Sequence, residues 1–174
     1  MRKSITVMLA EARDRFVRVS PAGALAEAAF GAVLVDIRPA WQRQADGEIP
    51  GSWVIERNHL EWRLDPASGA RLPWVSGYDH RIIVFCEEGY TSSLAAAALL
   101  DLGLSRSTDI SGGYRAWAAA GLPTAPAAAR SALIARGAVH AGLAGVLGRG
   151  QLEVGAEPGQ ALPRQVDQVR GDLL

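Results

Sequence analysis

The run Ile-Ile-Val-Phe at residues 82–85 leads directly into Cys86, the single cysteine of the 174-residue chain. A short run that is apolar at every position is typical of a strand buried on both faces of a parallel sheet. The Ala- and Leu-rich stretch from Ser92 to Leu102 then predicts a helix that ends at Gly103. A buried strand followed at once by a helix is the building unit of α/β proteins.

The same alternation runs through residues 20 to 125. Short apolar segments predict further strands at 33–35, 53–55 and 108–110, and other segments predict helices at 22–30, near 60–64 and between Gly113 and Gly121, with a loop at 67–79. We therefore expect an α/β fold, with a mostly parallel sheet flanked by helices on both faces. Functional sites in such sheets lie beyond the carboxyl ends of the strands, which is where Cys86 stands.

Composition narrows the functional classes. Equal numbers of acidic and basic residues give a net charge of zero, so there is no electrostatic case for a nucleic-acid partner or a membrane partner. A lone cysteine excludes an internal disulfide and any metal cluster held by cysteines alone. The charged residues from Glu11 onward interrupt the N-terminal apolar stretch too early for a signal peptide, so we expect a cytoplasmic protein.

The segment from Cys86 to Ser92 carries the chemistry. It joins the strongest strand to the amino end of a helix, where unpaired N–H groups and the helix dipole favour negative charge. Gly89 allows the backbone to curl so that successive N–H groups point inward, and the hydroxyl of Thr91 or Ser92 is expected to cap the helix. Such a loop can hold a sulfur anion, or a small oxyanion, against Cys86.

At these residues the sequence resembles a known family. The pattern Cys-x-x-Gly-x-Thr-Ser after an apolar strand is similar to the active-site loop of rhodanese-like sulfurtransferases. Three other segments resemble the family's motifs in the same order: Val-Leu-Val-Asp-Ile-Arg at 33–38, Gly-Glu-Ile-Pro-Gly-Ser at 47–52, and Ser-Gly-Gly-Tyr-Arg-Ala-Trp at 111–117. The resemblance implies a rhodanese-like domain at 20–125. It leaves a helical N-terminal extension at 1–19 and an Ala-, Gly- and Arg-rich C-terminal tail at 126–174, which we expect to be mobile.

The resemblance also implies a mechanism. Cys86 would take sulfane sulfur from a small donor, hold it as a persulfide, and pass it to an external nucleophile such as a small thiol or a thiol protein. Cys86 is then the catalytic residue, and the resemblance implies no metal and no organic cofactor. The substrate-binding loop comprises Glu87, Glu88, Gly89, Tyr90, Thr91 and Ser92, and the supporting residues are Asp36, Arg38 and Arg63.

This sequence departs from the family pattern inside the loop. Thr91 stands where many members have Arg, and Glu87 and Glu88 add two negative charges. A carboxylate about 7 Å from the sulfur would disfavour the thiolate by roughly 0.6–2.4 kcal/mol, which is comparable with the roughly 0.3–2 kcal/mol that a helix terminus contributes. We therefore expect repulsion of dianionic thiosulfate, which need not be the preferred donor.

Other charged residues are expected to support the site or to lie at the surface. Arg57, His59 and Arg63 follow the second strand, and one of them would face the pocket, although each alone is more typical of a surface charge. Asp36 and Arg38 are expected to tie their turn to the neighbouring loop. Glu48 replaces the usual His of the turn and is expected to be solvated.

Three alternatives stay open. Cys86 would be an inert core residue if the loop had no chemical role. The domain would be a non-catalytic binding module if the acidic loop served as a surface for a partner protein. A phosphatase or arsenate reductase would also use a cysteine loop for a tetrahedral oxyanion, but those loops are typically one residue longer and end with an anion-binding Arg.

Overall fold

A computed structural model describes residues 2–127 of the chain, and its centre is a four-stranded sheet. The strands are β1 (Val33–Asp36), β2 (Trp53–Val54), β3 (Ile82–Phe85) and β4 (Thr108–Asp109), in the order β2-β1-β3-β4. Every neighbouring pair is parallel, and Asp36 lies opposite Phe85 in the register of β1 and β3. The predicted parallel sheet is confirmed.

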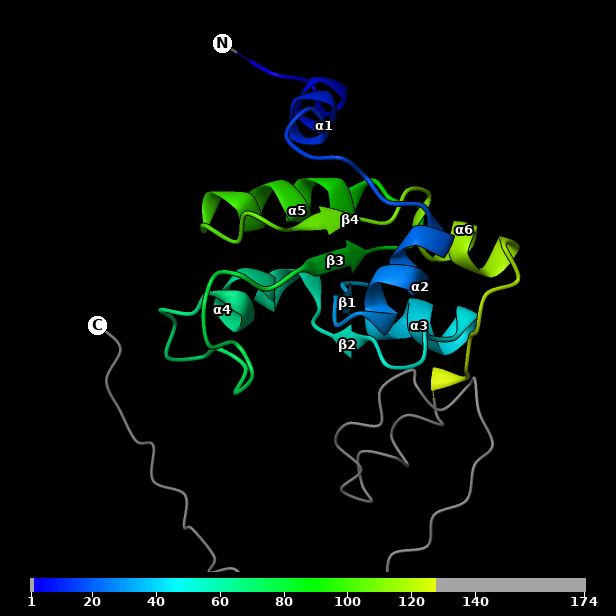
Figure 1. Cartoon of the computed structure of the whole chain (residues 1–174). Helices are drawn as coiled ribbons and strands as arrows, with labels where there is room; N and C mark the ends of the chain where they lie inside the picture. Colours follow the sequence, from blue (N-terminus) through cyan, green and yellow to red (C-terminus); the bar gives the residue numbers. More distant parts are fainter. Residues whose placement is uncertain (1, 128–174) are drawn as a thin grey trace, which may run out of the picture.

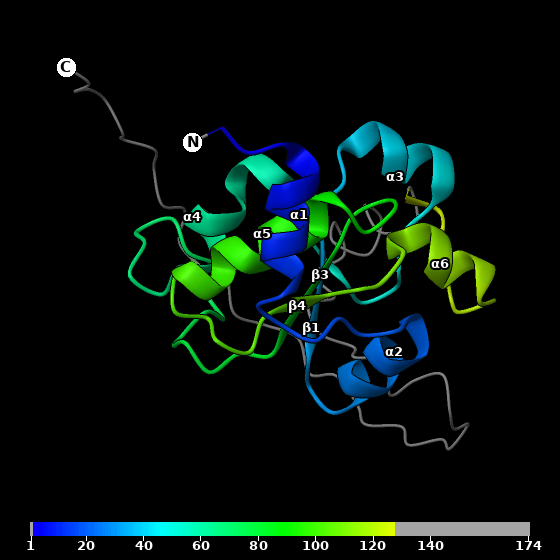
Figure 2. The same cartoon turned by 90° about the horizontal axis from the view of Figure 1, so that it is seen from above.

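Helices cover both faces of this sheet. They are α1 (Ile5–Arg13), α2 (Pro21–Ala29), α3 (Ala40–Asp46), α4 (Leu60–Leu64, after a 3-10 turn at Arg57–His59), α5 (Thr91–Asp101) and α6 (Gly113–Ala119). Figures 1 and 2 show α4 and α5 on one side of the strands and α2 and α6 on the other. The expected α/β class is therefore confirmed, whereas α3 was not foreseen.

The core explains the uninterrupted apolar run of β3. Val84 packs with Leu99 of α5 in one cluster, whereas Ile83 and Phe85 pack with Trp117 of α6 in another. All four side chains of β3 are completely buried because both faces of the strand are covered. A central strand of this kind fixes the position of the residue that follows it, Cys86.

The N-terminal segment forms α1. Ser4 caps this helix, since its hydroxyl accepts the N–H of Val7 at 3.3 Å. Figure 2 shows α1 lying across α5, outside the layer that α5 forms on the sheet. No helix within residues 2–127 is long and apolar enough to cross a bilayer. The tail expected to be mobile lies outside the described residues from 128 onward.

The start of α6 is hydrogen-bonded to the backbone of the cysteine loop. The N–H of Tyr114 donates to the Cys86 carbonyl at 2.9 Å, and the N–H of Arg115 donates to the Glu87 carbonyl at 3.0 Å. Gly113 makes this approach possible, since its φ is +62° and a Cβ there would lie against the Cys86 carbonyl, well inside contact distance. These hydrogen bonds to α6 hold the loop backbone in place.

The close approach at Gly113 can be tested against Gly121, which has a similar φ of +67° but open space around its would-be Cβ. Gly121→Ala should lower the free energy of unfolding by about 1–2 kcal/mol, the strain of the left-handed conformation alone. Gly113→Ala should cost that plus roughly 1–3 kcal/mol for the overpacked contact with Cys86. Urea denaturation followed by circular dichroism measures both, and equal losses in the two variants would contradict the packing described.

Candidate active site

Cys86 lies at the carboxyl end of β3, buried in the loop that leads to α5. The backbone N–H of Gly89 points at Cys86 Sγ at 3.2 Å, and that of Ser92 does so at 3.4 Å. Gly89 has a φ of +78°, a conformation that lets the loop curl around the sulfur. Two N–H donors directed at one sulfur favour its anionic forms, the thiolate and the persulfide.

The first turn of α5 differs in one respect from the expectation. Neither Thr91 nor Ser92 caps the helix, because the cap residue is Tyr90 and it has no side-chain capping bond. The Ser92 hydroxyl is engaged elsewhere, accepting from the Cys86 thiol at 3.4 Å and donating to Asp109 at 2.9 Å. The expected hydroxyl cap was wrong, and the uncapped turn leaves the Ser92 N–H available to the sulfur.

Asp109 is a site residue that sequence reasoning missed. It ends β4 beside the end of β3 and is completely buried. Its carboxylate accepts the hydroxyls of Ser92 at 2.9 Å and Ser93 at 2.8 Å, and it pairs with Arg18 at 2.7 Å. A buried acidic residue at a strand end was the available signal, but nothing in the sequence pointed to its partner Arg18, 91 positions earlier.

Arg38 connects the end of β1 to the cysteine loop. Its buried guanidinium pairs with Asp36 at 2.7 Å, donates to the Gly47 carbonyl at 2.8 Å and reaches Glu87 at 3.1 Å. Desolvation disfavours its charged form, but Asp36 and then Glu87 outweigh this and raise the pKa of Arg38 above its ordinary value. The guanidinium also lies 3.8 Å from the centre of the Tyr114 ring. Asp36 and Arg38 therefore join the turn to the loop, as the sequence suggested.

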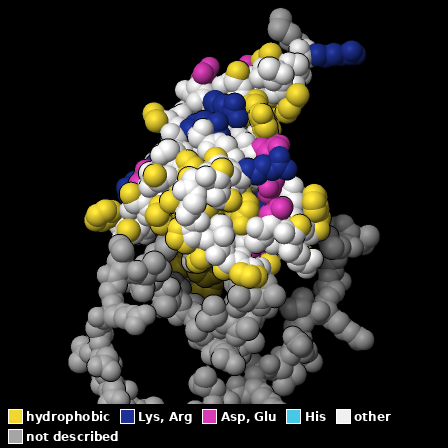
Figure 3. Space-filling model, turned by 90° about the vertical axis from the view of Figure 1, so that its right-hand side faces the viewer, with side chains coloured by type: hydrophobic (Ala, Val, Ile, Leu, Met, Phe, Trp, Pro, Cys, Tyr) yellow, Lys and Arg dark blue, Asp and Glu magenta, His cyan; other side chains and the backbone are white. Residues whose placement is uncertain are grey.

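The acidic pair of the loop contacts two arginines. Glu87 contacts Arg38 at 3.1 Å and Arg115 at 3.2 Å, and Glu88 contacts Arg115 at 2.5 Å. The hydrogen bond that Arg115 donates to Glu87, together with the charge of Glu88, raises the pKa of Arg115. Figure 3, which views the end of the molecule at the right of Figure 1, shows acidic and basic side chains next to each other on this face. Arg115 was not foreseen and offsets part of the negative charge of the loop, whereas the repulsion of dianionic thiosulfate stays a prediction.

A pocket of about 270 Å³ opens beside Cys86. Its walls come from the turn after β1, the 3-10 turn after β2 and the cysteine loop, and they comprise Ile37, Arg38, Pro39, Gln42, Arg57, Cys86, Glu87, Glu88, Tyr90 and Thr91. Of the cations proposed after the second strand, Arg57 lines this pocket, paired with Glu61 at 2.7 Å. Arg63 is absent from the lining, and its guanidinium donates to the Ala70 carbonyl at 2.8 Å. Its grouping with the site gains no support from the structure.

Glu48 also departs from expectation. It is 6% exposed rather than solvated, and it pairs with Arg43 at 3.1 Å. Arg43 lies on α3, the helix that the sequence analysis did not foresee, so the partner that allows this burial was also unforeseen. Among residues 2–127, no group of three or more His, Cys, Asp or Glu side chains is arranged to hold a metal ion.

Comparison with known proteins agrees with this geometry. The model of the rhodanese-like domain matches residues 21–120. Two curated relatives, both named thiosulfate sulfurtransferase GlpE, are 36% identical over 102 residues (Stutzerimonas stutzeri) and 38% identical over 104 residues (Pseudomonas entomophila). These alignments span 59% and 60% of this chain and 84% and 86% of the relatives.

One solved structure is also similar, at 35% identity and a TM-score of 0.66, over 72% of this chain and 96% of its own. It is a protein of unknown function from Rhodopseudomonas palustris, described as a possible tyrosine phosphatase. The sulfurtransferase class that the motifs predicted is supported by the curated relatives. With a family model that covers more than half of the sequence, the chain belongs to the family of rhodanese-like domains.

Proposed function

We propose that the chain is a sulfurtransferase that carries sulfane sulfur as a persulfide on Cys86 and passes it to an external thiol. The observation that carries this proposal is the pair of N–H groups, from Gly89 and Ser92, directed at Cys86 Sγ within a small pocket. A pocket of about 270 Å³ suits a small donor rather than a large one. Curated relatives named thiosulfate sulfurtransferase support the same class of reaction.

The reaction proceeds in two displacements. The Cys86 thiolate attacks the outer sulfur of the donor, forming a new S–S bond while the donor's own bond to that sulfur breaks and its remainder leaves with the electron pair. For thiosulfate that leaving group is sulfite. An external thiolate then attacks the outer sulfur of Cys86–S–S⁻, and Cys86 departs as the thiolate. Between the two steps, the loop N–H groups stabilise the negative charge on the sulfur.

The charges around the pocket favour an anionic donor more than the sequence alone suggested. Arg115 offsets part of the charge of Glu87 and Glu88, and Arg38 contacts Glu87 while paired with Asp36. Arg57 adds a cation to the wall, and its partner Glu61 lies one helical turn away in a partly exposed pair. An exposed pair of this kind is weak, so a donor anion can compete for the guanidinium. Thiosulfate, the substrate in the relatives' name, therefore becomes an acceptable donor for this chain.

A phosphatase is the second candidate, because the similar Rhodopseudomonas palustris structure carries that suggestion in its description. In this chain the loop from Cys86 to Ser92 contains no arginine. The two arginines that reach the loop's carboxylates, Arg38 and Arg115, are engaged by Glu87 and Glu88. The loop therefore lacks the anion-binding Arg that ends a phosphatase loop, so sulfur transfer is favoured.

The central prediction is a covalent one. Incubation with thiosulfate, 3-mercaptopyruvate or glutathione persulfide should increase the intact mass by one sulfur atom with at least one donor, and cyanide should remove that sulfur. Cys86→Ser should gain nothing because the nucleophile is lost. No gain with any donor would eliminate the proposal in favour of a binding module. Hydrolysis of p-nitrophenyl phosphate that depends on Cys86, without sulfur uptake, would favour the phosphatase.

The role of Arg57 gives a second prediction. Arg57→Gln should raise the KM for thiosulfate roughly two- to tenfold with little change in kcat, since an exposed cation that binds the donor contributes about that much. Glu61→Gln should lower the KM, because it releases Arg57 from its pair. Arg63→Gln is the matched control, with the same loss of charge outside the pocket. If Arg57→Gln and Arg63→Gln behave alike in steady-state kinetics, Arg57 has no specific contact with the donor.

A further inference from the structure

The carbonyl of Gly89 accepts hydrogen bonds from two arginine side chains. Arg13 and Arg18 each donate an Nη2 hydrogen to it at 2.9 Å, and the Ser93 hydroxyl, whose hydrogen goes to Asp109, lies 3.0 Å from it. The N–H of the same residue is directed at Cys86 Sγ. Gly89 therefore presents its N–H to the sulfur and its carbonyl to two guanidinium groups. Fixing the carbonyl limits rotation of the backbone at a glycine, the residue with the most freedom to rotate.

We infer that Arg13 and Arg18 are positioning residues, which hold the outer side of the cysteine loop so that the Gly89 N–H stays directed at the sulfur of Cys86. Both belong to residues 5–19, here called the N-terminal arm, which precede the segment matched by the family model. The inference rests on the proposed sulfur transfer and deepens it. It assigns a function to an arm that lies outside the family match.

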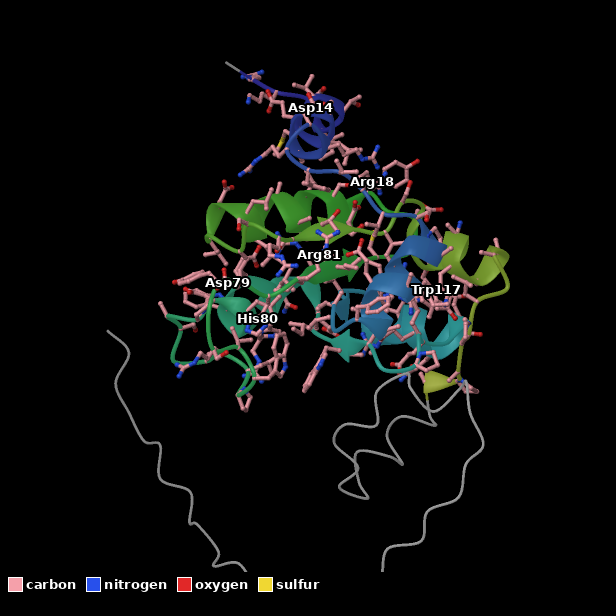
Figure 4. The ribbon with its side chains drawn as sticks, viewed as in Figure 1. Asp14, Arg18, Asp79, His80, Arg81 and Trp117 are labelled. Carbon is pink, nitrogen blue, oxygen red and sulfur yellow. The ribbon has the colours of Figure 1, made fainter. Side chains whose placement is uncertain are left out.

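Arg18 is anchored on the buried carboxylate of Asp109. Two of its nitrogens meet the two carboxylate oxygens at 2.7 and 2.8 Å, a bidentate geometry that fixes the plane of the guanidinium. The backbone beside it is fixed as well, since Val19 bridges Ile110 in parallel. Figure 4 labels Arg18 on the segment that leaves α1 and passes the end of β4. Through Asp109 and the Ser92 hydroxyl, Arg18 is also linked to Cys86 Sγ.

Arg13 reaches the loop from the last turn of α1. Besides the Gly89 carbonyl, it contacts the Ser93 hydroxyl through Nε at 3.1 Å and lies 5.6 Å from the centre of the Tyr90 ring. Within residues 2–127 it forms no ion pair with a carboxylate, so its charge is not offset locally. The arm thus brings to the loop a positive charge that Thr91, at the position often held by Arg in this family, does not supply.

The arm also contains a matched control. Arg15 pairs with Asp101 at 2.6 Å, near the far end of α5, and so holds α1 against α5 without touching the cysteine loop. Arg15→Gln removes the same charge from the same segment. Any effect that Arg13→Gln has beyond that of Arg15→Gln is therefore specific to the loop contacts.

The test measures the pH dependence of Cys86 alkylation by iodoacetamide in the full chain. Arg13→Gln should move the midpoint of the rate profile to higher pH and lower kcat/KM for sulfur transfer roughly 5- to 30-fold, because a charge-assisted contact behind the loop is lost. Arg13→Lys should restore the midpoint in part, since it retains the charge. Arg15→Gln should leave both quantities near those of the unaltered protein.

Arg18→Gln should also raise the alkylation midpoint and lower kcat/KM. It leaves Asp109 buried without its cation, however, and can prevent folding. Arg18→Gln combined with Asp109→Asn removes both charges and keeps the measurement possible if the single variant does not fold. If the alkylation profiles of the Arg13 and Arg18 variants match that of Arg15→Gln, the positioning role is refuted. Absence of sulfur uptake by the unaltered protein would refute the proposed function instead, and the alkylation profiles would still decide the role of the arm.

Discussion

The buried guanidinium of Arg38 is the contact on which the carboxyl end of the sheet depends. An isolated charge in that position would be strongly unfavourable, so its partners must stay in place for the domain to fold. Those partners come from separate parts of the chain: Asp36 at the end of β1, the Gly47 carbonyl in the following turn, and Glu87 in the cysteine loop. The ring of Tyr114 on α6 lies against the same guanidinium. One side chain therefore fixes the end of β1, a turn, the cysteine loop and α6 relative to one another, and the geometry around Cys86 follows from that arrangement.

The acidic loop illustrates how the size of an electrostatic effect depends on contacts that the sequence does not show. By their sequence position, Glu87 and Glu88 oppose an anion at Cys86. In the folded chain Glu87 offsets part of the charge of buried Arg38, and both glutamates hold Arg115 over the loop. Arg115 is largely exposed, so its contribution weakens as ionic strength rises, whereas the contacts of Arg38 are screened much less. The pocket thus combines buried Arg38, which is firmly paired, with exposed cations whose effect depends on ionic strength.

The parts of the structure set by local sequence could be predicted. The apolar run of β3, the helix after it and Cys86 between them depend on neighbours in the chain, and they agree with expectation. Helix α3 was missed because it has only seven residues, follows Pro39 without a side-chain cap, and buries none of its side chains. Its absence from the sequence analysis also led to the wrong expectation that Glu48 is solvated. The pairing of Arg18 with Asp109 could not be foreseen for a different reason, since it joins residues far apart in sequence that meet only when the arm folds along β4.

Burial of Cys86 places a condition on the second half of the proposed cycle. The Cys86 residue is only 9% exposed, so a small donor in the pocket reaches it more easily than a thiol on a protein surface. Once sulfur is bound, the reactive atom is the outer sulfur, about 2 Å beyond Sγ. The acceptor therefore needs to reach the outer sulfur and not the cysteine itself. In the proposed cycle, fixing the loop through Gly89 would serve both steps, since the N–H groups that stabilise the thiolate would also orient the persulfide for the acceptor.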